Sequence, residues 1–215
     1  MTPFLRYLDS FNRKERFFLI KAAMGESAFK LSKPFRVELE NKFGLSVPAN
    51  AFVAMDYHLD WIAASLFLAR PGTDEEAVHR NAGPIASGII RDVDLLVAFD
   101  DGNITNLLLI EAKATAAWST TEMRPKVERL KQIFGPDGKN YPEVRPQFAL
   151  TSPRQPEKLN TSFWPSWMTR DGASVWFPLP MPSERLVMTG CDDGGKSSKG
   201  RQYFRIDRKV YEQTP

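Results

Sequence analysis

Two segments near the N-terminus carry apolar residues at helical spacing. Residues 12–25 (NRKERFFLIKAAMG) predict a helix that Asn12 can cap and Gly25 can end. A second helix is predicted over residues 33–44, with Gly44 just past its end. The apolar run at 61–69 fits either a buried strand or a short buried helix, because periodicity alone does not separate the two.

Strand-like patterns follow in the middle of the chain. The runs at 92–99 and 105–114 are separated by turn residues, which predicts a β-hairpin. Residues 120–135 return to helical spacing, and 146–152 form another strand candidate. The order of these elements predicts an α/β protein whose central mixed β-sheet is flanked by helices.

The same pass along the chain predicts three parts within one domain. We expect an N-terminal helical segment over 1–30, a core over 31–155, and a β-rich basic C-terminal extension over 156–215 that packs on the same domain. The long connection at 71–88 has no clear periodicity, and long loops in compact domains are often functional.

Charged residues interrupt the predicted hairpin at one end. Residues two apart on a strand share a face, so Asp92 and Asp94 point the same way, as do Glu111 and Lys113. A turn at residues 102–103 would set Asp94 opposite Glu111, whereas a turn at 101–102 would set Asp92 there. Either register gathers the acids and the lysine in a single patch.

Two facing carboxylates on a buried hairpin are unfavourable unless a positive charge lies between them. Lys113 supplies part of that charge, and a divalent cation would supply it better. Carboxylate-rich oxygen ligands suit Mg²⁺ or Mn²⁺, with water and a substrate phosphate completing the shell. These residues therefore predict a metal-dependent hydrolytic site.

Asp94, followed after a gap by Glu111-Ala112-Lys113 in a hydrophobic strand, resembles the PD-(D/E)xK nuclease superfamily. The resemblance implies a restriction-endonuclease-like core in which Asp94 and Glu111 bind the metal and Lys113 assists the attacking water. In one departure from the motif, Val93 rather than proline precedes Asp94.

The resemblance implies further site residues outside the hairpin. An additional acid is expected from the helix before the first core strand, where Glu38 and Glu40 are both candidates, and Asp92 is a third. The helix after the E-x-K strand is expected to face DNA, and its candidate contacts are Lys126, Arg129 and Gln132.

The C-terminal stretch 196–210 holds six Lys or Arg against one Asp, interleaved with aromatic residues. Such a composition is typical of segments that grip phosphate backbones and stack bases, although a charged edge strand has the same composition. Its expected nucleic-acid contacts are Lys196, Lys199 and Arg201.

Two further motifs are interpreted as structural. GCDDGGKS (190–197) matches the phosphate-loop pattern, but too little chain follows for the required helix and strands, so we expect a hairpin loop. The cluster Asp56, His58 and Asp60 is interpreted as a local cap or cleft lining rather than a zinc site.

Composition and charge narrow the class of protein. A net charge of +3 and a pI near 9.0 are compatible with a nucleic-acid partner. Cys191 is the single cysteine and no window holds 18 apolar residues, so we expect an intracellular, cytoplasmic protein without a membrane span.

The sequence thus predicts a metal-dependent nuclease, a DNA endonuclease of restriction or repair type, with DNA favoured over RNA. Cleavage of both strands of a duplex would favour a homodimer. The alternative is a non-catalytic nucleic-acid-binding or protein-interaction module that keeps the fold.

Overall fold

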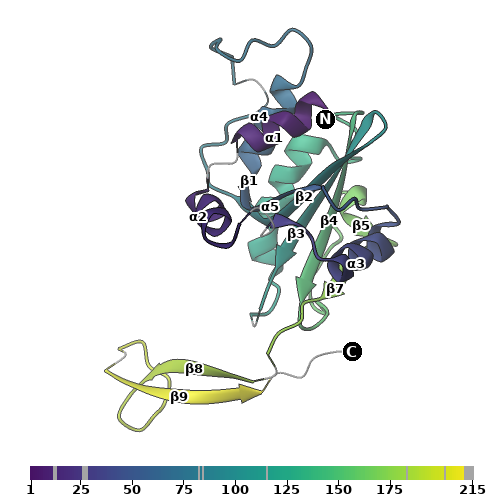
Figure 1. The fold of residues 1–215 in the computed structure, drawn as a ribbon. Coiled ribbons are helices and arrows are strands. Elements are labelled where there is room, and N and C mark those ends of the chain that lie inside the picture. The colour runs from purple at the N-terminus through teal and green to yellow at the C-terminus, as the bar shows by residue number, and fades with distance from the viewer. Residues whose placement is uncertain are drawn as a thin grey trace.

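The protein is described by a computed structural model. It describes residues 1–11, 14–25, 29–81, 83, 85–114, 116–182, 184–200 and 202–210. The model is an α/β protein whose mixed five-stranded sheet has helices on both faces, as the sequence predicts (Figure 1).

The sheet has the strand order β1-β2-β3-β4-β7. Its strands are β1 (Phe52–His58), β2 (Asp92–Asp101), β3 (Ile104–Ala112), β4 (Val144–Ser152) and β7 (Trp176–Pro178). β1, β2 and β3 form an antiparallel meander, whereas β3, β4 and β7 run parallel. The predicted hairpin is β2–β3, and the predicted strand at 146–152 is β4.

The helices are α1 (Pro3–Phe11), α2 (Glu15–Met24), α3 (Lys33–Phe43), α4 (Leu59–Leu68) and α5 (Thr120–Phe134). α4 resolves the ambiguous run at 61–69 as a helix, and His58 caps it by accepting a hydrogen bond from the Asp60 amide at Nδ1. Sequence periodicity missed α1 and β1. The predicted cap Asn12 lies outside the described residues.

Each face of the sheet has its own apolar core. On one face, α1, α4 and α5 pack against the inward residues of β2 and β3, including Leu96 and Leu109. On the opposite face, α3 contributes Leu39 and Phe43, which pack against Val97. Because side chains alternate along a strand, Asp94 and Glu111 belong to the face covered by α5.

The C-terminal extension divides into two parts. Its first part reaches the core through Trp164, Met168 of the short helix η2 (Ser166–Met168), and Phe177. It also contains a minor pair, β5 (Thr169–Arg170) and β6 (Ala173–Ser174).

The second part of the extension is a separate hairpin of β8 (Glu184–Cys191) and β9 (Tyr203–Val210). It lies beyond one end of the sheet (Figure 1). One of its faces displays exposed apolar side chains: Leu186, Met188, Phe204, Ile206 and Val210. The 190–197 motif spans the end of β8 and the connecting loop, and no helix follows it among the described residues, so the hairpin-loop prediction is confirmed.

Several strands of the sheet begin or end at the same edge. The carboxyl ends of the parallel strands β3, β4 and β7 lie there, together with the start of the antiparallel β2. Leu179, just past β7, donates its amide hydrogen bond to the Ser152 carbonyl at the end of β4 (N···O 3.0 Å). The chain therefore leaves this same edge toward the β8–β9 hairpin.

Candidate active site

The hairpin register brings the two predicted metal ligands together. Asp101 pairs with Ile104 across a turn at Gly102 and Asn103, and Leu95 pairs with Ile110. The next opposed positions are Asp94 and Glu111, the first of the two registers considered from the sequence. Oδ2 of Asp94 accepts a hydrogen bond from the Ala112 amide at 2.7 Å, which fixes its carboxylate beside the end of β3.

Glu111 is a buried carboxyl group, only 6% exposed. Lys126 of α5 places its ammonium Nζ 2.5 Å from the Glu111 Oε1. Burial raises the pKa of Glu111 to about 7; Lys126 opposes the rise, and the nearby charge of Asp94 adds to it. A carboxyl group with this pKa exchanges its proton near neutral pH, as a general acid or base requires.

Lys113 lies at the mouth of the site, where β3 has just ended. Its ammonium pairs with Glu122 in the first turn of α5 and donates to the Ala117 carbonyl at 3.4 Å. The same Nζ lies 5.5 Å from the centre of the Trp118 ring. Lys113 is thus held by the segment that joins β3 to α5.

The donor set fits a hard divalent cation bound through few protein ligands. Mg²⁺ commonly takes one or two carboxylates and completes its shell with water and substrate phosphate. Asp94 and Glu111 are two such ligands, since they occupy opposed positions at the end of the β2–β3 hairpin. Among the described residues, no group of three or more His, Cys, Asp or Glu side chains is arranged to hold a metal.

The other candidate acids have different surroundings. Asp92 shares the face of Asp94, but its Oδ2 pairs with Lys14 at 2.7 Å, while Oδ1 is buried without a hydrogen-bond partner among the described residues. Glu38 and Glu40 lie on α3, which packs on the opposite face of the sheet. Their contacts are local, so the structure does not bring them to Glu111.

Arg129 requires a correction. It was expected to contact nucleic acid, but it is 3% exposed and pairs with Asp60 at 2.7 Å. The helical period explains this, because Arg129 lies three residues after Lys126 and beside the buried Leu130, on the packed side of α5. Gln132 lies on the exposed side of α5.

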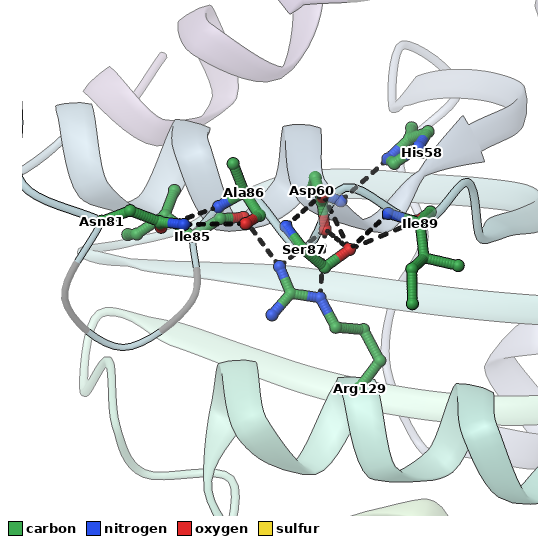
Figure 2. A network of polar contacts seen from close by, with 8 residues as sticks. All are labelled: His58, Asp60, Asn81, Ile85, Ala86, Ser87, Ile89 and Arg129. Atoms are coloured by element: carbon green, nitrogen blue, oxygen red, sulfur yellow. Dashed lines mark hydrogen bonds and ion pairs between the residues drawn. The ribbon is translucent and has the colours of Figure 1, made fainter.

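Arg129 belongs to a polar network that ties the long connection to two helices (Figure 2). Its guanidinium donates to Oδ1 of Asp60 and to the Ile85 carbonyl, and Ser87 donates its amide and hydroxyl hydrogens to the same carboxylate. Burial alone would raise the pKa of Asp60, but the hydrogen bonds from Ser87 and Arg129 lower it below its ordinary value. The network holds α5 in place one turn beyond Lys126.

The role of Lys126 was not anticipated. It was expected to face DNA, whereas it lies against Glu111 inside the site. The helical spacing indicates this position, because Lys126 lies three residues after the buried Met123 and next to the buried Val127, close to the packed side of α5. Glu122, which pairs with Lys113, was also missed.

The basic residues of the C-terminal hairpin lie at the surface. Lys196 and Lys199 are exposed in the β8–β9 loop, where the Asp192 carboxylate accepts the Lys196 amide hydrogen at 2.8 Å. Arg201 lies outside the described residues.

Neither protein-family models, curated proteins nor solved structures show a match to this chain. Within the described part of the chain, no helix has the length and apolar character that crossing a membrane would require.

Proposed function

We propose that this protein is a metal-dependent nuclease, a DNA endonuclease of restriction or repair type. One observation carries the proposal: Asp94, Glu111, Lys113 and Lys126 gather at one sheet edge, with Glu111 buried at a pKa near 7. Glu111 is buried and the other three side chains are partly buried. Burying a carboxyl group at an apolar strand end costs stability, so a chemical role is a direct explanation.

The residues have separable roles under this proposal. The carboxylates of Asp94 and Glu111 would hold Mg²⁺ or Mn²⁺, which supplies Lewis-acid stabilisation of the phosphate and a more acidic water. The hydrogen bond from the Ala112 amide keeps the Asp94 carboxylate oriented before substrate arrives. Burial raises the pKa of Glu111 to about 7 without a metal, so metal binding would favour the ionised carboxylate and release a proton.

The two lysines balance charge in different places. Lys126 Nζ remains against the buried Glu111 Oε1 and limits repulsion between the two acids. Lys113 is paired with Glu122, whose side chain is 60% exposed, so that pair is partly open to solvent. A phosphate at the mouth of the site would compete with Glu122 for the Lys113 ammonium, which would then orient the attacking water or stabilise developing charge.

The strand arrangement also supports the proposal. From α3 to β4 the order is helix, strand, the β2–β3 hairpin, crossover helix and parallel strand, with α4 and the long connection inserted between β1 and β2. That is the order of the restriction-endonuclease-like core that the E-x-K motif implies. The β8–β9 hairpin, whose far loop carries Lys196 and Lys199, is joined to the edge that carries the site, and its basic surface favours nucleic acid as the substrate.

The test is a cleavage assay on plasmid and single-stranded DNA with Mg²⁺, Mn²⁺ or EDTA. We expect metal-dependent cutting that is lost in Glu111→Gln and Lys113→Ala, while both variants stay folded. The matched controls are Glu143→Gln and Lys139→Ala, exposed residues at the opposite end of the sheet. Equal cutting by the double variant Glu111→Gln/Lys113→Ala and by the wild type would refute the proposal.

A second function is favoured by the ion pairs. Glu111 with Lys126, and Lys113 with Glu122, are paired without any added ion. That arrangement suits a nucleic-acid-binding module that does not cut. It predicts salt-sensitive DNA binding and no thermal shift with Mn²⁺, whereas the nuclease should be stabilised by the metal.

A further inference from the structure

A pocket opens beside the candidate active site, and neither Asp94 nor Glu111, the residues that would hold the metal, lines it. Its volume is about 350 Å³, within the range of small-molecule sites. Its walls are the described residues just after β3 (Lys113, Ala114 and 116–118) and the end of β4 with the segment that follows it, 152–158. Adjacent parallel strands of an α/β sheet commonly bind ligands at this place, outside their carboxyl ends.

The Trp118 ring is held rigidly at one wall of the pocket. Its indole N–H donates to the Ser152 hydroxyl at 3.0 Å, and the Trp176 indole N–H donates to the same oxygen, also at 3.0 Å. The Ser152 hydroxyl in turn donates to the Arg154 carbonyl at 2.7 Å. Because the Ser152 hydroxyl accepts from both indoles and donates to a carbonyl, it fixes the Trp118 ring before any ligand binds.

The pocket wall is also positively charged. Lys113, Arg154 and Lys158 line it, against the single acid Glu157. Neither Arg154 nor Lys158 has a side-chain hydrogen bond or ion pair within the described part of the chain. A flat aromatic ring beside unpaired cations is suited to a ligand that combines a planar base with a phosphate.

We propose that this pocket binds one unstacked nucleotide of a single-stranded nucleic acid, next to the phosphate that the site would cut. The base displaces the Lys113 ammonium that lies over the Trp118 ring and stacks there, and its phosphate contacts Arg154 or Lys158. This inference rests on the proposed nuclease function and adds that the preferred substrate is single-stranded or locally unpaired, because a base inside an intact duplex cannot enter a pocket.

The test measures binding in EDTA, where cutting is absent, by fluorescence anisotropy of labelled oligothymidylate and of a dA·dT duplex of equal length. We expect Trp118→Leu to weaken single-strand binding about tenfold or more and to leave duplex binding nearly unchanged. Trp118→Phe loses the hydrogen bond to Ser152 but keeps an aromatic face on which a base can stack. It should therefore retain most of the single-strand affinity.

Arg154→Gln provides a second variant that should fold normally, since its side chain is exposed. It should weaken single-strand binding and lower its salt dependence. The matched control is Arg145→Gln, an exposed arginine at the other end of β4. Any of three results would overturn the pocket assignment. The first is unchanged single-strand binding in both Trp118→Leu and Arg154→Gln, and the second is an equal loss of single-strand and duplex binding. The third is an equal loss of affinity in Trp118→Phe and Trp118→Leu.

Failure of the nuclease proposal would look different. Trp118-dependent binding of single strands by a wild-type protein that does not cut with Mn²⁺ would support the pocket and refute the enzyme. Metal-dependent cutting that Trp118→Leu leaves unchanged on both substrates would support the enzyme and refute the pocket.

Discussion

Replacing Glu111 with glutamine should change the pH dependence of stability in a defined direction. The carboxyl group has an ordinary pKa of 4.5 and a pKa of about 7 in the folded protein, where burial is the main cause. The folded state therefore binds this proton more tightly than the unfolded state. Between these two values the unfolded state carries fewer protons, so the free energy of unfolding falls as pH rises.

The size of the effect follows from the same two values. At about 1.4 kcal/mol for each pH unit, the difference between the two pKa values corresponds to about 3 kcal/mol, most of which falls between pH 5 and pH 8. Glutamine has nearly the shape of the protonated acid and does not titrate. The stability of Glu111→Gln relative to wild type should therefore rise by roughly 2 to 3 kcal/mol from pH 5 to pH 8.

The assay is urea unfolding of both proteins at pH 5, 6, 7 and 8, followed by circular dichroism. Comparing the two proteins at each pH cancels the other titrating groups, which both share. Glu143→Gln, an exposed glutamate at the far end of the sheet, is the control and should show no such trend. A difference between Glu111→Gln and wild type that stays constant across this range would refute the buried, high-pKa carboxyl group.

Three further outcomes are expected. Arg129→Met should lower the free energy of unfolding by about 1–3 kcal/mol, because it removes the charged hydrogen bonds to Asp60 and leaves that partly buried carboxylate with those from Ser87. Gln132→Ala on the exposed side of the same helix should change it by about 0.5 kcal/mol or less, and similar urea midpoints would contradict this. Replacing Lys196 and Lys199 together with glutamine should weaken DNA binding about equally for all sequences and reduce the slope of log K against log salt by about two; an unchanged slope would remove the hairpin loop from the interface. Millimolar Mn²⁺ should raise the melting temperature of wild type at pH 8 but not that of Asp94→Asn, and equal shifts would place the metal elsewhere.

Local patterns in the chain were enough to predict the central hairpin and its helical neighbours. β2 and β3 have long apolar runs around a Gly-Asn turn, and α5 has a clear helical period and a serine cap. β1 was missed because its seven residues include Asp56 and His58, which dilute the alternation, and because the apolar run of α4 follows without a break. At Asp56 the backbone φ is 49°, an uncommon value for a residue inside a strand, and Arg16 pairs with its side chain.

The sequence by itself determined that Asp94, Glu111 and Lys113 share one patch, because alternation along a strand places them on one face in either register. Only the tertiary structure decided which residues of α5 complete that patch. Lys126 and Arg129 look alike as solvent-facing bases in the sequence, yet one pairs with Glu111 and the other with Asp60. Strand alternation is a local property of the backbone, whereas the partner of a helix side chain depends on how that helix packs across the sheet.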